Sequence, residues 1–267
     1  MNIMIDQLTQ NLLAVLEKHK ALGIAEQIDY QKFYLYSLVT HSTAIEGSTV
    51  TEIENQLLFD EGITPKTPNV QELMMNIDLK KAYEYSMQLA HEHADFSIDM
   101  LKELSAMVMK NTDRQYFTAA GNIDASKGDL RLVDVTAGPG GRFYMHYQKI
   151  PAKLEELCQH NNEHRRILLN QPDVIEAYHL SFDAHCRLVT IHPWVDGNGR
   201  IARLVMNHLQ YEFGLIPTKI KKENKAEYIQ ALMNAQEQES PEPFRRFMIR
   251  EHAQNLEQEI LTFEKSL

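Results

Sequence analysis

The sequence predicts a mainly α-helical protein that carries one small β-hairpin. Apolar residues recur at three- and four-residue spacing through most of the 267 residues, which is the period of one helix face. Glycine and proline gather in a few short stretches that separate these helical patterns. Only between Gly121 and Ile150 do apolar residues partly alternate on both sides of a Gly/Pro turn, as they do in a hairpin.

The N-terminal part of the chain shows five helical patterns. The first runs from about Met4 to Leu22 and stops at Gly23. The second runs from Tyr30 to Glu46 and stops at Gly47, which suits the left-handed position that closes many helices. Three more helices are predicted over residues 51–59, 70–91 and 97–109, joined by short polar or proline-bearing loops.

The hairpin is predicted from two apolar runs that flank the turn Ala137–Gly141. The residues concerned are Leu130, Val133 and Val135 before the turn and Phe143, Met145 and Tyr147 after it. An exposed hairpin edge can bind an extended peptide through main-chain hydrogen bonds. A purely structural loop is the other interpretation of this segment.

Helical patterns return in the C-terminal half. They cover residues 153–168 and 172–189, and the second is apolar enough to be a central buried helix. A further helix begins near Arg200 and ends at Gly214, and the chain is helical again from Glu223 onward.

Composition bounds the classes of function. The formal net charge of −10 argues against non-specific binding of nucleic acid, which needs a basic surface. The N-terminus shows neither a signal peptide nor a long apolar span, so we expect a cytoplasmic protein without a membrane partner. Cys158 and Cys186 lie far apart without a metal-ligand pattern, and reduced thiols are the expectation.

Residues 191–207, IHPWVDGNGRIARLVMN, carry most of the chemistry of the chain. Proline and two glycines disfavour a helix over 192–199 and predict a tight loop that leads into a helix. Backbone N–H groups at the start of such a helix lack internal partners and, with the helix dipole, attract anions. Arg200 and Arg203 are predicted to face away from the core, where their guanidinium groups can bind phosphate oxygens.

The same loop offers a base and a metal ligand. His192 can titrate near neutrality, and the Asp196 carboxylate can hold Mg²⁺ against a bound phosphate. Taken singly, His192 also fits an ordinary loop histidine, the Gly-Asn-Gly stretch a common turn, and the two arginines solvated helix residues. Their occurrence together in this order predicts a phosphoryl- or nucleotidyl-transfer site.

This stretch resembles the signature of Fic-domain proteins, His-Pro-Phe-x-(Asp/Glu)-Gly-Asn-Gly-Arg-x-x-Arg. Every specified position matches except that Trp194 replaces phenylalanine. The resemblance covers roughly residues 116–250 and implies a Fic-type helical bundle whose hairpin forms a flap over the active site. We expect an N-terminal helical region over 1–110, a catalytic core over 111–250 and a C-terminal helix over 251–267.

The resemblance implies transfer of AMP from ATP to a Ser, Thr or Tyr hydroxyl of a target protein and of the chain itself. His192 would remove the hydroxyl proton, and Asp196 would hold Mg²⁺ between the α- and β-phosphates. Arg200 would assist the diphosphate leaving group, and Arg203 would contact the γ-phosphate. Further nucleotide-binding residues implied by the resemblance are Gly197, Asn198 and Gly199 of the loop, Val135, Thr136, Ala137 and Gly138 of the flap, and Tyr228, Ile229 and Gln236 near the C-terminus.

Two of these assignments have structural alternatives. The resemblance implies that Tyr228 stacks on a purine and that Gln236 hydrogen-bonds to its edge, but the stripe of a core helix explains the pattern nearly as well. The resemblance also implies that the flap holds the target protein as an extended segment. Self-association through helical surfaces is a further expectation, without a stoichiometry.

Ser42, Glu46 and Gly47 form a second, shorter motif. Its spacing alone favours a helix end with a solvated glutamate. Beside the longer signature, it resembles the inhibitory motif Ser/Thr-x-x-x-Glu-(Gly/Asn) of the Fic subclass with an N-terminal inhibitory helix. The resemblance then implies that Glu46 reaches Arg203 and holds ATP in an unproductive pose.

Alternatives remain open at this point. Fic relatives also transfer UMP, phosphate or phosphocholine, and some remove AMP. From another class, the protein could be a nucleotide-responsive interaction module with negligible catalysis.

Overall fold

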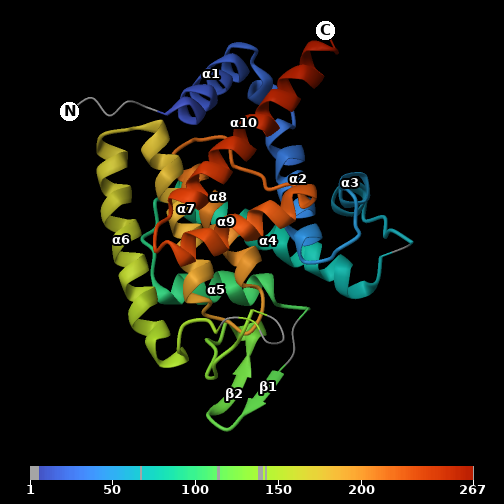
Figure 1. The fold of residues 1–267 in the computed structure, drawn as a ribbon. Coiled ribbons are helices and arrows are strands. Elements are labelled where there is room, and N and C mark those ends of the chain that lie inside the picture. Colours follow the sequence, from blue (N-terminus) through green and yellow to red (C-terminus); the bar gives the residue numbers. More distant parts are fainter. Residues whose placement is uncertain (1–5, 67, 113–114, 138–140, 142, 267) are drawn as a thin grey trace, which may run out of the picture.

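The computed structural model describes residues 6–66, 68–112, 115–137, 141 and 143–266, which form a bundle of helices with one small hairpin (Figure 1). Ten α-helices are present within these residues. They are α1 Gln7–Ala21, α2 Tyr30–Ile45, α3 Glu52–Glu61, α4 Val70–His91, α5 Ile98–Val108, α6 Ile150–Asn170, α7 Val174–Ile191, α8 Asn198–Glu212, α9 Lys225–Glu237 and α10 Glu242–Glu264. Short 3₁₀ turns cover Ile24–Glu26, Ala125–Lys127, Tyr147–Lys149 and Lys222–Asn224. The helix predictions are confirmed, and the expected start at Met4 lies outside the described residues.

Side-chain caps define where several helices begin. Thr51 with Glu54, and Asn69 with Glu72, form capping boxes at the starts of α3 and α4, so that side chains satisfy the first free amides. Helix α8 differs, because its N-cap is Gly197 and no side chain caps it. The first amides of α8 are therefore left for another acceptor.

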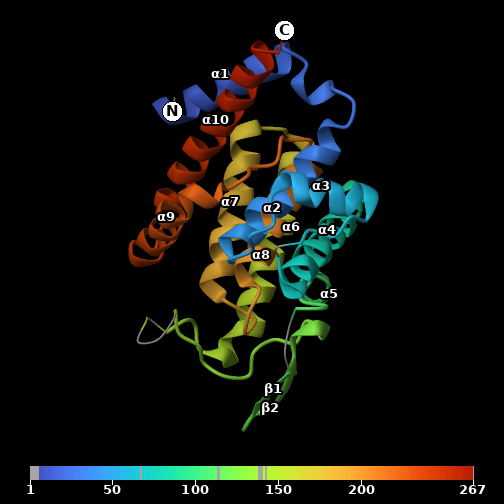
Figure 2. The same ribbon diagram turned by 90° about the vertical axis from the view of Figure 1, so that its right-hand side faces the viewer.

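The bundle is layered around α7 and α8. Helix α6 packs against α7, α7 against α8, and α8 against α4, while α2 packs against both α4 and α8. Helix α1 lies along α10 at one end of the molecule, and the hairpin projects from the opposite end (Figures 1 and 2). The loop between α7 and α8 lies near the hairpin end of the molecule (Figure 1). The described part of residues 128–147 lies at the same end, and this segment is called the flap below.

Two apolar clusters form the core. One is built by α2, α4, α5, α6 and the inner faces of α7 and α8, and the other by α1, α9, α10 and further α7 residues. Ile201, Leu204 and Leu209 are fully buried, which confirms the apolar face predicted for α8. Since the first cluster joins residues from both sides of position 110, the N-terminal helices and the expected catalytic core share one core. The domain boundaries stay a prediction.

The hairpin lies earlier in the chain than predicted. Strands β1 Gln115–Thr118 and β2 Gly121–Asp124 pair antiparallel, whereas the two predicted arms meet, among the described residues, in one isolated bridge between Thr136 and Phe143. The reason is visible at Arg131. Its guanidinium takes the carbonyl groups of Val133 and Met145, which a strand ladder would otherwise use. The predicted arms therefore form a loop organised around a buried cation.

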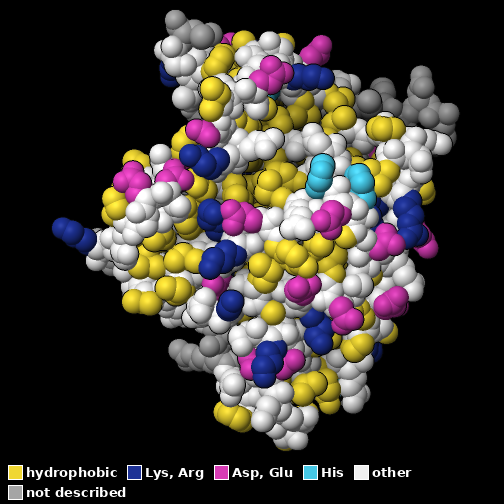
Figure 3. Space-filling model, turned by 180° about the vertical axis from the view of Figure 1, so that it is seen from behind, with side chains coloured by type: hydrophobic (Ala, Val, Ile, Leu, Met, Phe, Trp, Pro, Cys, Tyr) yellow, Lys and Arg dark blue, Asp and Glu magenta, His cyan; other side chains and the backbone are white. Residues whose placement is uncertain are grey.

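Surface charge is mixed on the face opposite to Figure 1. Basic and acidic side chains alternate over it (Figure 3). None of the helices formed by the described residues combines the length and apolar character needed to cross a bilayer. Both cysteines are free and buried.

Candidate active site

The site is built on the turn between α7 and α8. His192 closes α7 in the left-handed region, with φ +51°, and its N–H donates to the carbonyl of Leu188 at 3.0 Å. Asn198 then holds the turn, because its Oδ1 accepts from the N–H of Trp194 at 3.0 Å and its Nδ2 donates to the Trp194 carbonyl at 2.9 Å. The Asn198 side chain thus stabilises the turn through two hydrogen bonds to the Trp194 backbone.

Trp194 occupies the aromatic position of the loop in full burial. Its indole Nε1–H donates to the carbonyl of Gly128 at 3.2 Å, so the extra polar group of tryptophan is satisfied. Tryptophan in place of phenylalanine therefore adds a hydrogen bond between the loop and the flap segment and leaves no buried polar group unpaired at this position.

Two glycines let an anion approach the start of α8. Gly197 has φ +81°, and a Cβ there would lie 2.6 Å from Sδ of Met109, so only glycine fits. A Cβ at Gly199 would lie 2.7 Å from Oε1 of Glu46, which shows that this carboxylate sits directly over the first turn. The Glu46 carboxylate thus lies where uncapped amides and the positive end of the helix dipole favour a negative charge.

Both arginines of the signature are buried, contrary to the prediction that they face away from the core. Arg200 is 2% exposed and Arg203 is 3% exposed. The cause is that α2 covers this side of α8 and Tyr228 of α9 packs over Arg203. Within the described residues, Nε and Nη1 of Arg200 have no hydrogen-bond partner, and its Nη2 lies 3.5 Å from Asp196 Oδ2. Buried donors without partners mark a place for an anionic ligand.

Arg203 is held by the second motif. Its Nη2 donates to Glu46 Oε1 at 2.6 Å and to the Ser42 carbonyl at 3.0 Å, and its Nε donates to Ser42 Oγ at 2.8 Å. Gly47 follows with φ +104° and turns the chain away from the site. The predicted approach of Glu46 to Arg203 is therefore present as an ion pair between α2 and α8.

The charge state of Glu46 follows from this contact. Burial raises the pKa of Glu46, but the charge of Arg203 and its hydrogen bond outweigh burial and leave the pKa below its ordinary value. A carboxyl with a lowered pKa stabilises its contact above the ordinary pKa and loses it only as the pH falls through the lowered value. Glu46 is therefore an anion throughout the neutral range.

His192 is poised as a neutral base. Burial and the nearby charge of Arg131 lower its pKa to about 4, against the opposing carboxylates of Asp196 and Glu46. The ring of Tyr144 stacks on the imidazole with centroids 3.7 Å apart and planes 12° apart. At neutral pH the imidazole is uncharged and able to accept a proton.

Arg131 and Tyr144 are site residues that sequence reasoning missed. Besides its two flap bonds, Arg131 donates from Nε to the His192 carbonyl at 2.7 Å, and its backbone N–H donates to the Pro193 carbonyl. The sequence signal for Arg131 was its place in residues 128–131, which resemble part of the Fic flap, but this resemblance gave its side chain no role. The flap segment and the turn between α7 and α8 are thus joined by one buried side chain.

We expect Arg131→Met to lower the free energy of unfolding by about 3 kcal/mol, because three partly buried carbonyl groups lose their donor. Urea unfolding followed by circular dichroism measures it. Arg166→Met is the matched control, since that guanidinium is mostly exposed and pairs with Asp95 at the surface. Equal losses for the two variants would contradict the structural role of Arg131.

The residues assigned to the nucleotide base are placed unequally. Tyr228 is 4% exposed, and its ring packs against His185, Phe244 and Phe247, which favours the core interpretation over stacking on a purine. Ile229 on the next position is partly exposed. Of the flap residues, Val135 precedes the bridge, Thr136 forms it with Phe143, Ala137 follows it, and Gly138 lies outside the described residues.

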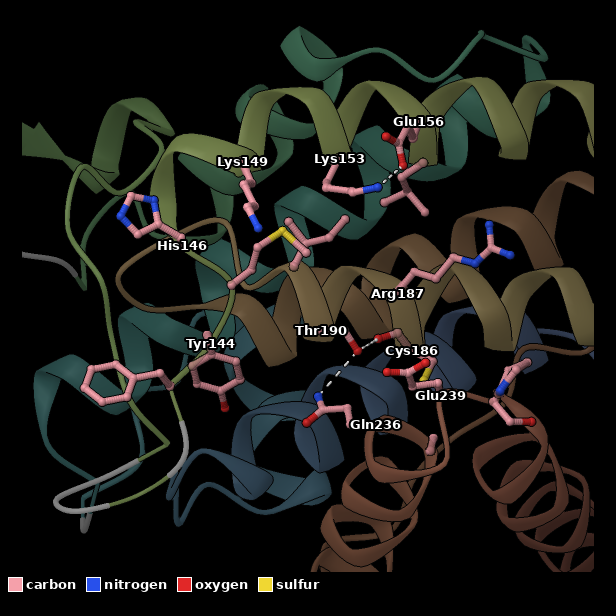
Figure 4. A pocket seen from close by; sticks show the side chains of 17 residues that line it. Tyr144, His146, Lys149, Lys153, Glu156, Cys186, Arg187, Thr190, Gln236 and Glu239 are labelled. Atoms are coloured by element: carbon pink, nitrogen blue, oxygen red, sulfur yellow. Dashed lines mark hydrogen bonds and ion pairs between the residues drawn. The ribbon is translucent and has the colours of Figure 1, made fainter.

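Gln236 lines a cavity of about 750 Å³ beside the end of α7 (Figure 4). Its walls come from the flap at Tyr144, from α6, from α7 at Thr190, and from the α9–α10 connection. Because Tyr144 also covers His192, the cavity adjoins the proposed base. A purine and its sugar fit within this volume.

Asp196 is the single candidate for a metal ligand in the turn. Its Oδ1 accepts from the Gly197 N–H at 2.6 Å, and more than half of its side chain is exposed. No group of three metal-ligating side chains occurs among the residues the structure describes. One carboxylate beside an anion site suits Mg²⁺, which proteins often hold by one or two carboxylates together with substrate phosphates.

Fold and site together define a helical protein in which a turn between two central helices presents uncapped amides and a buried, partly unpaired arginine. Residues 95–210 match the family model described as the Fic/DOC family. This part of the chain, which includes the α7–α8 turn, is a Fic domain.

Relatives by sequence extend beyond this domain. The chain is 27% identical over 204 residues to protein adenylyltransferase fic-1 of Caenorhabditis elegans, covering 76% of this chain and 36% of that protein. It is 29% identical over 256 residues to protein adenylyltransferase Fic of Drosophila virilis, covering 92% and 46%. The chain therefore spans less than half the length of these curated relatives.

Solved structures show the same fold. A Fic domain containing signaling protein from Bacteroides thetaiotaomicron superposes with a TM-score of 0.75 at 19% identity, over 96% of this chain and 97% of that one. Fic-1 of Caenorhabditis elegans gives a TM-score of 0.72 at 22% identity, over 97% and 74%. The helical architecture thus agrees over nearly the whole chain.

Proposed function

We propose that this protein is a protein adenylyltransferase that transfers AMP from ATP to a hydroxyl group of a target protein and of itself. The observation that carries the proposal is the buried, partly unpaired Arg200 at an uncapped helix start, with the neutral imidazole of His192 beside it. Among nucleoside monophosphates, AMP is favoured because the sequence relatives are named adenylyltransferases.

In the proposed reaction, His192 takes the proton of the attacking hydroxyl as its oxygen bonds to the α-phosphate and the bond to diphosphate breaks. The amides of Gly197, Asn198 and Gly199 stabilise the charge that develops on the α-phosphate. Arg200 offers its free donors to the departing diphosphate. The donor substrate brings Mg²⁺, which Asp196 would hold against the phosphates.

The Glu46–Arg203 ion pair supports autoinhibition. Arg203 would contact the γ-phosphate in a productive pose, but Glu46 occupies its guanidinium at 2.6 Å and lies over Gly199. A carboxylate at this place both removes a donor and repels a phosphate. On this proposal the chain belongs to the subclass with an N-terminal inhibitory helix, here α2.

The target is proposed to bind as an extended segment along the flap. Phe143, on the flap beside the Thr136 bridge, is 71% exposed and offers an apolar contact to such a segment. The antiparallel bridge between Thr136 and Phe143 supports this proposal, because residues in such a bridge have the extended backbone that strand-like pairing with a segment would need.

The function is tested by incubating the Glu46→Gly protein with Mg²⁺ and ATP labelled at the α-phosphate, following label on protein by gel and mass spectrometry. The expected product is protein that is heavier by one AMP. Label from UTP or CDP-choline but not from ATP would replace AMP by another donated group. Bound ATP without transfer to the chain or to an added lysate would instead support an interaction module.

A further inference from the structure

Thr190 and Gln236 meet in the cavity next to the catalytic turn. Thr190 lies in the last turn of α7, two residues before His192, and Gln236 lies in the last turn of α9. The Gln236 Nε2 atom lies 3.4 Å from the Thr190 Oγ1 atom, and both side chains line the cavity (Figure 4). The pair joins the two helices at the place where a nucleotide base would enter.

The threonine hydroxyl has only one proton, and that proton is already used. Thr190 Oγ1 donates to the Cys186 carbonyl one turn earlier at 2.8 Å, which is the shorter of its two contacts. Toward Gln236 the same oxygen can therefore act only as an acceptor. The amide of Gln236 must turn its NH₂ group to Thr190, so that its Oε1 is the atom left for a ligand.

We propose that Thr190 is a positioning residue that orients the Gln236 amide and thereby selects a donor whose base is a 6-aminopurine over one whose base is a 6-oxopurine. The carbonyl of a side-chain amide pairs with an exocyclic amino group while its N–H pairs with the neighbouring ring nitrogen. A 6-oxo group presents an acceptor where the amide also presents an acceptor, and the pairing fails. The inference rests on the proposed function, because it names the base of that donor.

Without the anchor, the amide would be free to rotate. A glutamine side chain can exchange its oxygen and nitrogen by half a turn about its last bond at little steric cost. It could then offer N–H to a 6-oxo group as readily as it offers oxygen to a 6-amino group. Thr190 therefore adds discrimination without touching the base itself.

The test compares the affinities of ATP and ITP, which differ in the group at position 6 of the purine and in the proton that the 6-oxo form carries on the neighbouring N1. Isothermal titration with Mg²⁺ is carried out on the Glu46→Gly protein and on the same protein with Thr190→Val, Thr190→Ser or Gln236→Ala. We expect the parent to prefer ATP by at least about tenfold, as a wrongly paired buried acceptor costs about that factor. Thr190→Val, which has the same shape without the hydroxyl, should lose the preference, and so should Gln236→Ala, whereas Thr190→Ser should keep it.

The inference is overturned if the parent binds ATP and ITP equally, if neither binds, or if Thr190→Val keeps the parental ratio. The ratio of two dissociation constants does not depend on transfer, so its failure is separate from that of the proposed function. Transfer of AMP together with an unchanged ratio in Thr190→Val would remove only the role of Thr190. The expected ratios without any transfer would remove only the proposed activity.

Discussion

His192→Ala, introduced into the Glu46→Gly protein, is expected to lower the rate of AMP transfer by about 10²–10⁴-fold, the range that removal of a general base usually costs. The affinity for ATP should change little, because the phosphate donors belong to α8 and not to the imidazole. Labelling with α-phosphate-labelled ATP measures the rate, and isothermal titration measures the affinity.

The pH dependence follows from the environment of His192. Its pKa is lowered to about 4, first by burial and then by the charge of Arg131. The protonated, inactive imidazole therefore makes up half of the molecules only near pH 4, so protonation of His192 should not limit transfer between pH 5 and 8. A loss of transfer with a midpoint near pH 6.5 would show that the imidazole is as exposed as in a peptide.

His146→Ala is the matched control for this prediction. His146 belongs to the flap but is about half exposed, and its ring stacks on Tyr147 and lies 3.6 Å from Asp134. His146 also lines the cavity that would hold the base, so the rates are compared at saturating ATP. Transfer should then stay within about threefold of the parent, since no hydrogen bond joins His146 to the α7–α8 turn in the described part of the chain. Equal loss in the two variants would assign the effect to the flap and not to a base.

Local signals in the sequence were enough to predict the helices and the turn that joins α7 to α8. Helix periods and glycine stops depend on neighbouring residues, and α4 spans the predicted 70–91. The turn from His192 to Arg203 was found because its residue types carry its chemistry in consecutive order. Side chains that act within one stretch of chain can be recognised there.

What the sequence could not give depends on partners far along the chain. Burial of Arg203 comes from α2, more than 150 positions away, and Arg131 binds carbonyl groups on both sides of the flap turn as well as that of His192. The hairpin was placed too late because alternation of apolar residues does not reveal that a guanidinium takes their carbonyl groups. For Tyr228 the resemblance implied stacking on a purine and the helix pattern allowed a core position, and only the packing of helices distant in sequence, which buries its ring, favours the core position.

Glu46→Gly is expected to raise transfer by about 10–100-fold over the unmodified chain. Removing the carboxylate frees Nη2 of Arg203 and clears the space over Gly199, and a charge-assisted hydrogen bond of this kind is worth one to two factors of ten. Self-labelling with α-phosphate-labelled ATP measures the ratio. Glu46→Gln should fall between the two proteins, because it keeps the size of the side chain and loses its charge.

Glu92→Gly separates loss of the ion pair from loss of a helix end. Glu92 is the C-cap of α4 as Glu46 is the C-cap of α2, and it is exposed and far from Arg203 in sequence. It should leave labelling at the level of the unmodified chain.

Since the pKa of Glu46 lies below its ordinary value, the ion pair persists from pH 8 down past pH 5. The rate of self-labelling by the unmodified chain should therefore stay low over that whole range. Activation of the unmodified chain by mild acid, or equal labelling by the unmodified and Glu46→Gly proteins, would mean that the Glu46 carboxylate does not restrain Arg203. Whatever activates the protein would then have to act elsewhere than on the contact between α2 and α8.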